Sequence, residues 1–249
     1  MLTEERWKEI LDILEKEGAV SVQELAVSLN TSAATVRRDL AQLDAMGKLV
    51  KVHGGATSVS LQYMTRDMSM AEKYDLHREE KQAIAKYAAP LIKPNDFVYI
   101  DAGTTTEMLV DTITERQAIY MTNSMIHARK LSQKGCRVYL PGGEVKQLTE
   151  AVIGGEAADF IRNYHFTIGF WGTNGVTVES GFTTPEPHEA LIKRVSMEQT
   201  AKRYVLMDRS KFNVVAPVTF ADFSAATIIT DVVPDQIYKK HKSIVEVMK

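Results

Sequence analysis

Three helical patterns follow one another within the first 45 residues, and this feature most restricts what the chain can fold into. In the first pattern, apolar side chains recur from Trp7 to Leu14 at the i, i+3, i+4, i+7 spacing that places them on one helix face. We expect Thr3 to cap this helix and Gly18 to end it. The chain therefore begins with an amphipathic helix that has one apolar stripe.

Polar caps mark the second and third helical patterns. Ser21 and Glu24 have the spacing of a capping box, and the short helix that they open is predicted to end at Asn30. The third helix is predicted to run from a Ser32 cap to about Ala45. Only a few residues separate each helix from the next.

The third helix has two distinct faces. At 100° per residue, Val36, Leu40 and Leu43 lie within a narrow arc and must face the core. The opposite side has small side chains around an arginine, which suits a helix that lies close to another molecule, and a DNA major groove admits one such helix. The residues on and beside this side are Ala34, Thr35, Arg37, Arg38, Ala41, Gln42 and Ala45. A solvated surface face with two ordinary arginines is the alternative interpretation.

The residues after the third helix predict a strand and a hairpin. Gly47 is expected to end the helix, residues 49–53 resemble a short strand, and Gly54 with Gly55 can form the bend of a wing. Helix, helix, recognition helix and hairpin is the order of a winged helix-turn-helix, predicted here over residues 1–56. The predicted DNA-binding residues are Ser32, Thr35, Arg37, Arg38, Lys48, Lys51 and His53.

Net charge does not indicate DNA binding. Residues 1–58 carry seven Lys or Arg and nine Asp or Glu, and the formal charge of the whole chain is −2. Residues 31–55, in contrast, carry four basic and two acidic side chains. The prediction of DNA binding therefore depends on where the charges lie.

The remainder of the chain predicts an α/β domain. Residues 57–72 have no clean periodicity and are predicted to be a linker. A helix is predicted over residues 79–92, and strands over 97–100, 118–122, 137–140, 166–170, 203–207, 218–220 and 227–230. This alternation predicts a mostly parallel sheet in a domain that occupies residues 73–249.

Small and polar residues follow the predicted strands, where parallel sheets bind ligands. The sequence Gly-Thr-Thr-Thr at residues 103–106 places hydroxyl and N–H groups at a helix N-terminus, which can hold an anion. A threonine cluster that only caps the helix is the alternative. Lys193 and Lys211 can add positive charge, and Asp101 and Asn123 can bond sugar hydroxyls. The predicted effector-binding residues are Asp101, Gly103, Thr104, Thr105, Thr106, Asn123, Gly142, Gly143, Lys193, Asp208 and Lys211.

Other classes of protein are disfavoured by what the sequence lacks. No lysine follows the threonines and no G-x-G-x-x-G motif occurs, which argues against nucleotide binding. The single cysteine, Cys136, cannot form an internal disulfide, and the six histidines lack metal-binding spacing, so we expect neither a metal nor a cofactor. No run of 18 apolar residues and no signal peptide are evident, so a cytoplasmic protein without a membrane partner is expected.

The sequence SVQELAVSLNTSAATVRRDLAQLDAMGKLVKVHGGA resembles the signature of the DeoR family of bacterial repressors. Lys51 departs from it, since an arginine is more usual there and lysine lacks its bidentate fork. The segments DAGTTT, MTNS, PGGE, FWGTNGV, LIKR and MDRSKF resemble the effector domain of that family, so the resemblance extends from residue 3 to about residue 231. It implies a ribose-5-phosphate isomerase-like fold and a sugar-phosphate inducer, with phosphate at residues 104–106 and Lys211 nearby. Fructose 1-phosphate and a tagatose phosphate lie within the family's range.

These observations predict a DNA-binding repressor of a sugar-utilisation operon, whose affinity for operator DNA is controlled by a phosphorylated sugar. Two recognition helices about 34 Å apart read half-sites one DNA turn apart, so a homodimer or homotetramer is expected. The rival hypothesis is a sugar-phosphate isomerase, with Asp101 or Glu144 as the base and Lys193 as the electrophile. A recognition helix has no purpose in such an enzyme.

Overall fold

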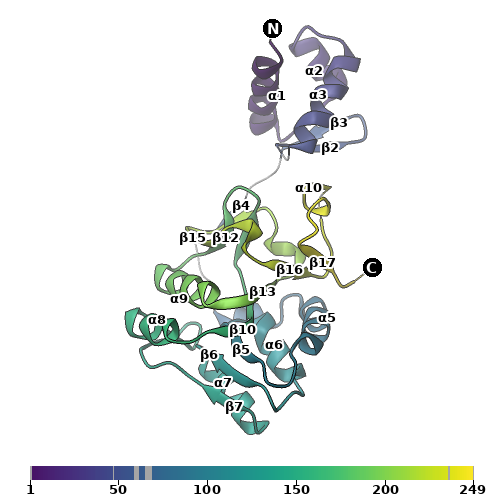
Figure 1. The fold of residues 1–249 in the computed structure, drawn as a ribbon. Helices are drawn as coiled ribbons and strands as arrows, with labels where there is room; N and C mark the ends of the chain where they lie inside the picture. The colour runs from purple at the N-terminus through teal and green to yellow at the C-terminus, as the bar shows by residue number, and fades with distance from the viewer. Residues whose placement is uncertain (1, 47, 59–61, 65–68, 235, 249) are drawn as a thin grey trace. The chain divides into compact units, whose positions relative to one another are not determined.

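The computed structural model describes residues 2–46, 48–58, 62–64, 69–234 and 236–248. The chain forms two compact units, one of residues 1–61 with 234–241 and one of residues 62–233 with 242–249 (Figure 1). Among the described residues, no helix is long and apolar enough to cross a membrane.

The first unit combines helices with a three-stranded antiparallel sheet of order β1-β3-β2. Its elements are α1 (Thr3–Glu17), β1 (Ala19–Ser21), α2 (Val22–Ser28), α3 (Ala33–Ala45), β2 (Val50–Val52), β3 (Gly55–Thr57) and α10 (Gln236–Lys239). The apolar stripes of the first three helices converge in one core, where Ile10, Leu14, Leu25, Leu40 and Leu43 are almost wholly buried. Three packed helices followed by the β2–β3 hairpin confirm the predicted winged helix-turn-helix.

The predicted helix ends in this unit are only partly confirmed. Thr3 is the first helical residue and Leu2 takes the cap position, so the predicted cap is wrong. Gly18 ends α1 with a φ of 73°, in the left-handed region that favours glycine. α2 ends at Ser28, earlier than the predicted Asn30. The expected stop at Gly47 lies outside the described residues.

The second unit is built on a seven-stranded sheet in which every neighbouring pair of strands is parallel. Its strand order is β17-β16-β13-β10-β5-β6-β7. In chain order these strands are β5 (Phe97–Ile100), β6 (Ile119–Thr122), β7 (Arg137–Tyr139), β10 (Phe166–Trp171), β13 (Thr200–Leu206), β16 (Thr227–Thr230) and β17 (Ile244–Glu246). The sheet confirms the predicted parallel α/β architecture.

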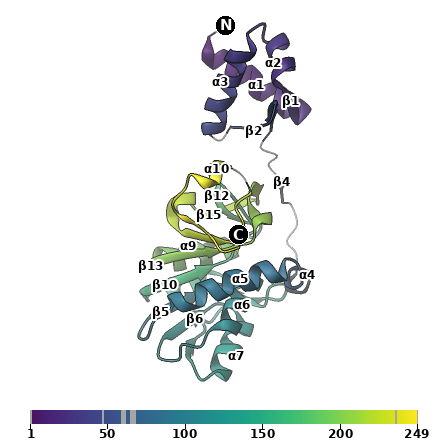
Figure 2. The ribbon, with the colours of Figure 1, turned by 90° about the vertical axis from the view of Figure 1, so that its right-hand side faces the viewer.

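Helices cover both faces of this sheet (Figures 1 and 2). α5 (Arg78–Ala88), α6 (Thr104–Thr112) and α7 (Met125–Gln133) pack on one face, against Val98 and Ile100 of β5. α8 (Gly155–Arg162) and α9 (Pro187–Glu198) cover the other. On that face Tyr99 stacks on Trp171 with ring centroids 5.6 Å apart, and Trp171 Nε1 donates to Ser196 Oγ of α9 at 2.9 Å. Alternate residues of β5 thus pack against the helix layers on opposite faces of the sheet.

Smaller sheets stand beside the main one. β11 (Gly175–Thr177), β12 (Gly181–Thr184) and β15 (Val218–Ala221) form one antiparallel sheet, β8 (Glu144–Lys146) pairs with β9 (Ala151–Ile153), and β14 (Val214–Val215) pairs with β4 (Gln62–Tyr63). α4 (Met70–Tyr74) lies before α5. The helix predicted over 79–92 ends at Ala88 and continues as a 3₁₀ turn over Ala89–Leu91, since Pro90 has no N–H to donate.

The strand order has one switch point, between β5 and β10. From β5 the chain proceeds through β6 to β7 at one edge, whereas β10, β13, β16 and β17 extend toward the other edge. In open parallel sheets, the loops that leave the carboxyl ends of the strands at such a point diverge and leave a crevice. Residues 101–103 and 172–174 leave β5 and β10 there.

Candidate functional site

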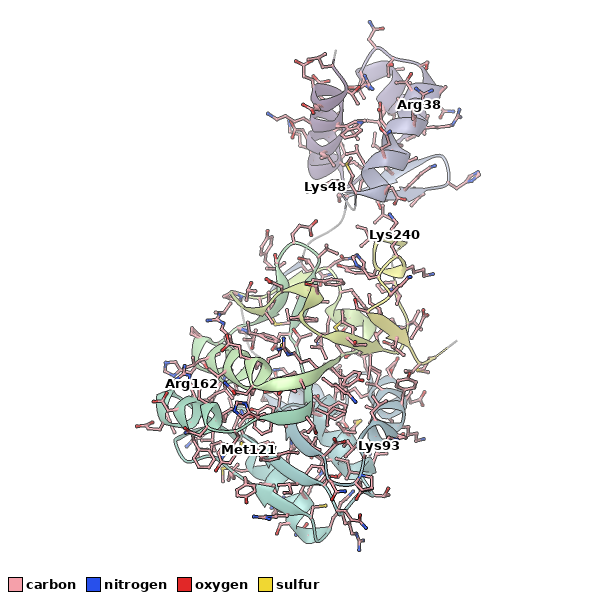
Figure 3. The ribbon with its side chains drawn as sticks, viewed as in Figure 1. Arg38, Lys48, Lys93, Met121, Arg162 and Lys240 are labelled. Carbon is pink, nitrogen blue, oxygen red and sulfur yellow. The ribbon has the colours of Figure 1, made fainter. Side chains whose placement is uncertain are left out.

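The exposed face of α3 carries the predicted DNA-binding side chains. Arg37 and Arg38 are exposed on α3, whereas Val36, Leu40 and Leu43 of the same helix are buried. Figure 3 labels Arg38 on this helix. Neither arginine forms an ion pair with a residue that the structure describes. The N-terminus of the helix is fixed by its predicted cap, because the Ser32 hydroxyl accepts from Thr35 N at 3.1 Å and lies 2.9 Å from the Thr35 hydroxyl.

A buried carboxylate holds α3 against α1. Asp39 accepts hydrogen bonds from Arg6 Nε at 2.5 Å, Arg6 Nη2 at 3.0 Å and Trp7 Nε1 at 3.0 Å. Although burial raises the pKa of Asp39, the hydrogen bonds from Arg6 and Trp7 outweigh it and hold the pKa below its ordinary value. Asp39 was not among the predicted residues, yet a signal was present, because Asp39 falls on the same helical arc as Val36, Leu40 and Leu43.

The wing is anchored at both of its strands. Lys51 N of β2 donates to Asp44 Oδ1 of α3 at 3.1 Å. In β3, Gly55 lies so close to β1 that a Cβ there would be 2.2 Å from Val20 O, so only glycine fits. Lys48 and His53, the other predicted residues of this region, are exposed with Lys51. Arg37, Arg38, Lys48, Lys51 and His53 are therefore all open to solvent.

The second unit contains a cavity of about 380 Å³ at the switch point of the sheet. Its walls include the loops that follow β5 and β10, the loop that follows β13, and the first turns of α6 and α9. Six of the predicted effector-binding residues line it: Gly103, Thr104, Thr105, Lys193, Asp208 and Lys211. The structure thus brings together predicted residues from three separate parts of the sequence.

The N-terminus of α6 opens into this cavity. Gly103 occupies the cap position and offers no side chain to the helix, and the first intrahelical bond runs from Glu107 N to Gly103 O at 2.8 Å. The N–H groups of Thr104 and Thr105 therefore precede the helical hydrogen-bonding pattern, and both residues line the cavity. Backbone N–H groups, two hydroxyls and the positive end of the helix dipole favour an anion at this position.

Lysines supply positive charge to the same walls. Lys81 of α5 is only 4% exposed, and its ammonium group donates to the carbonyl oxygen of Lys73. Burial lowers the pKa of Lys81, an effect that the nearby Asp208 carboxylate opposes. An ammonium group has three donors, and Lys81 uses one of them within the described residues. Lys211 also lines the cavity and lies close enough to Lys81 to lower its pKa.

Lys193 is held differently, by a buried ion pair. Its ammonium group bonds to Asp101 Oδ2 and to Gly172 O, the latter at 3.2 Å. Gly172 N also donates to Asp101 Oδ2 at 3.2 Å. Burial raises the pKa of Asp101, although Lys193 opposes the shift. Asp101 does not line the cavity. The base and electrophile named for an isomerase thus bond to each other, and Glu144, the other candidate base, also lies outside the cavity lining.

Four further predicted effector residues lie away from the cavity lining. Asn123 uses its side chain within the fold, because its Oδ1 accepts from Ala102 N at 3.0 Å and its Nδ2 donates to Val152 O at 3.3 Å. Thr106 donates from Oγ1 to Gly103 O at 2.9 Å. Gly142 and Gly143 precede β8 and are also absent from the lining.

Lys81 and Glu189 are two of the charged lining residues that were not among the predicted effector residues. Lys81 lies on the same face of α5 as Ile84, Ala85 and Ala88, so a lysine within a buried stripe was the available signal. Glu189, in the first turn of α9, accepts from Lys146 Nζ at 3.0 Å and from Thr149 Oγ1 at 2.8 Å. No sequence signal indicated Glu189, since its partners are about 40 residues away along the chain.

Neither metal nor thiol chemistry has a site among the described residues. No group of three or more His, Cys, Asp or Glu side chains there could hold a metal ion. Cys136 is buried, its Sγ lies 3.7 Å from Glu115 O, and burial raises the pKa of the thiol.

Comparison with known proteins matches both units. The model of the DeoR-like helix-turn-helix domain matches residues 6–62, and the model of the DeoR C-terminal sensor domain matches residues 76–232. The chain is 40% identical to a Bacillus subtilis protein described as the uncharacterised HTH-type transcriptional regulator FruR, and 33% identical to the lactose phosphotransferase system repressor of Streptococcus mutans. Both similarities cover 100% of each chain. A ribose 5-phosphate isomerase A from Methanocaldococcus jannaschii is 14% identical, with 55% of each chain covered and a TM-score of 0.40.

Proposed function

Because this chain belongs to the DeoR family of helix-turn-helix transcriptional regulators, we propose that it represses a sugar-utilisation operon and that a phosphorylated sugar controls its affinity for operator DNA. The observation that carries the proposal is the cavity at the switch point, where the open N-terminus of α6 meets lysine side chains. Its volume of about 380 Å³ suits a small metabolite.

The operator is bound by the exposed face of α3 and by the wing. Arg37 and Arg38 contact guanine edges or phosphates, and Ser32 and Thr35 contact the DNA backbone at the helix N-terminus. Lys48, Lys51 and His53, in and beside the wing, contact phosphates. The protein acts as a homodimer or homotetramer, because one recognition helix reads only one half-site.

The effector's phosphate binds at Thr104 and Thr105, with Lys81 and Lys211 as counter-charges. A phosphate there gains backbone N–H donors, the helix dipole and ammonium groups together. The polar groups of Asp208 and Glu189, in the same cavity, can accept hydrogen bonds from sugar hydroxyls. DNA and effector bind different populations of the protein, so each changes the affinity for the other by the same factor.

Calorimetry on the full-length chain tests the effector site. Fructose 1-phosphate, a tagatose phosphate and inorganic phosphate are titrated into the wild type and into Thr105→Ala and Lys211→Ala. Loss of one hydrogen bond to a charged group, about 1.5–3 kcal/mol, predicts affinity about 10- to 150-fold weaker in each variant. Lys202→Ala, an exposed lysine at the start of β13, is the matched control and retains wild-type affinity. Unchanged affinity in both cavity variants would place the phosphate elsewhere.

The alternative of catalysis at the same cavity has its own test. Incubation of the protein with aldose and ketose phosphates, followed by analysis of the products, is expected to show no interconversion. Interconversion that is lost in Asp101→Asn would overturn the proposal that the cavity only senses its ligand.

A further inference from the structure

The chain that follows the first stretch of the DNA-reading unit, called the joining segment and described over residues 62–64 and 69–77, contributes a large share of the cavity wall. Seven of the residues that line the cavity lie between positions 62 and 77: Gln62, Tyr63, Met64, Met70, Lys73, Leu76 and His77. The first of these positions belong to the linker predicted over residues 57–72. The first stretch of the DNA-reading unit ends at residue 61, and the first described residues of the sensor unit, from Gln62, line the cavity.

This segment is docked by a short strand. In β4, Gln62 N donates to Asn213 O at 2.9 Å, and Met64 N donates to Val215 O at 2.9 Å, with Tyr63 in register with Val215. Tyr63 is 73% exposed. A two-residue pairing with few buried apolar contacts contributes little stability, so the docking of β4 on β14 is readily shifted by a ligand.

The partner strand, in contrast, is firmly placed. Asn213 N donates to Val176 O at 3.0 Å, which ties the start of β14 to β11. A Cβ on Gly175 would lie 2.2 Å from Val214 O, so β14 lies directly against the start of β11. β14 therefore offers β4 a fixed edge.

Direct contacts link the docked segment to the cavity. Asn174, at the carboxyl end of β10, donates from Nδ2 to Met64 Sδ at 3.8 Å, and its Oδ1 accepts from Thr184 Oγ1 at 3.2 Å. Further along, the carbonyl oxygen of Lys73 accepts from the buried Lys81 ammonium group. A ligand in the cavity thus lies beside the joining segment and beside the side chains that contact this segment.

We propose that the joining segment is both a wall of the effector site and its reporter: an effector that contacts Gln62 and Met64 stabilises the pairing of β4 with β14. This pairing fixes the chain at the point where it leaves for the DNA-reading unit, and its gain or loss changes operator affinity. The inference rests on the proposed function, because it assigns regulation to the same cavity. If the pairing of β4 with β14 cannot open, ligand binding can no longer change it. Operator affinity then no longer depends on whether the cavity is occupied.

A reversible crosslink between the paired strands tests this. Tyr63→Cys and Val215→Cys are combined in a Cys136→Ser background, since partners on neighbouring strands lie about 4.7–4.9 Å apart and disulfides span Cα separations of about 4.4–6.8 Å. The single Val215→Cys variant in the same background is the matched control, because Val215 does not line the cavity. Operator affinity is measured by fluorescence anisotropy, on DNA selected by the wild type from a random pool. Each measurement is made with and without fructose 1-phosphate or a tagatose phosphate.

The control is expected to keep the wild-type ratio of operator affinities, at least about fivefold, and the oxidised double variant is compared with its own reduced form. On oxidation the ratio of the double variant falls to about one, while calorimetry still detects sugar-phosphate binding. An oxidised protein that binds the sugar phosphate and keeps the wild-type ratio overturns the inference, as does failure of the disulfide to form. If the wild type binds neither sugar phosphate, the proposed function itself fails, and the inference with it.

Discussion

Substitution of Asp39 by alanine is expected to loosen the recognition helix without touching the DNA-binding face. The carboxylate of Asp39 is the shared acceptor for three donors, two from Arg6 and one from Trp7 of α1. Asp39→Ala leaves those donors without a protein partner and removes the polar link between α1 and α3. The apolar contacts of Leu40 and Leu43 remain.

The magnitude follows from burial and charge. Removal of one member of a fully buried ion pair costs about 3–5 kcal/mol, because the remaining charge is buried without a partner. The Arg6 side chain is partly exposed and can turn toward water. We therefore expect about 2–4 kcal/mol for Asp39→Ala, which corresponds to an opening equilibrium about 30- to 900-fold larger.

Native-state hydrogen exchange measures this opening element by element. Protection of the Leu40 and Leu43 amides should fall by that factor, whereas the amides of β10 in the other unit should be unchanged. Asp12→Ala, an exposed aspartate of α1, is the matched control and should leave protection as in the wild type. Protection of α3 within threefold of the wild type, or an equal loss in β10, would refute the reasoning.

The stability that the Asp39 carboxylate contributes is expected to depend on pH. The pKa of Asp39 in the folded chain lies below its ordinary value of 3.8. The charged form is thus favoured by folding, and its contribution is fully present above the ordinary pKa. It is lost as the pH falls through the lower, folded-state value. Exchange measured at neutral pH reports the full contribution.

Three other variants test the wing, the cavity and the recognition helix separately. Gly55→Ala forces a Cβ against Val20 O and displaces the wing, so operator affinity should fall at least about tenfold while calorimetry shows unchanged sugar-phosphate binding. Lys81→Met removes a buried ammonium group, so sugar-phosphate affinity should weaken about 10- to 150-fold with no drop in the thermal midpoint. Unchanged affinity would show that Lys81 does not contact the sugar phosphate. Arg38→Ala should lower the salt dependence of operator binding by about one unit of slope, and an unchanged slope and affinity would exclude a DNA contact.

Local patterns predicted the elements of this fold well. The apolar stripes of α1 and α3, the Ser21–Glu24 capping box and the buried runs that became β5 and β10 are all encoded within a few residues of each other. Periodicity and capping act over such distances, so the sequence alone indicates them. The threonines at the start of α6 were found for the same reason.

Features that depend on distant segments could not be predicted in this way. The amide of Asn123 is polar and follows a strand, but its hydrogen bonds go to Ala102 and Val152, which the sequence does not place beside it. The pairing of β4 with β14 joins residues about 150 positions apart, and no periodicity marks a two-residue strand. Lys81 was overlooked although it lies on a buried stripe, because its carbonyl partner and the neighbouring Asp208 come from other elements.

The central claim is that sugar-phosphate occupancy of the cavity controls operator binding by α3, and reciprocal titration tests it most directly. The operator dissociation constant is measured with and without saturating sugar phosphate, and the sugar-phosphate dissociation constant with and without saturating operator, in the wild type and in Lys211→Ala. If occupancy of the cavity controls operator binding, the two ratios agree and are at least about fivefold in the wild type. The claim is contradicted if the protein binds both operator and sugar phosphate but neither ligand changes the affinity for the other.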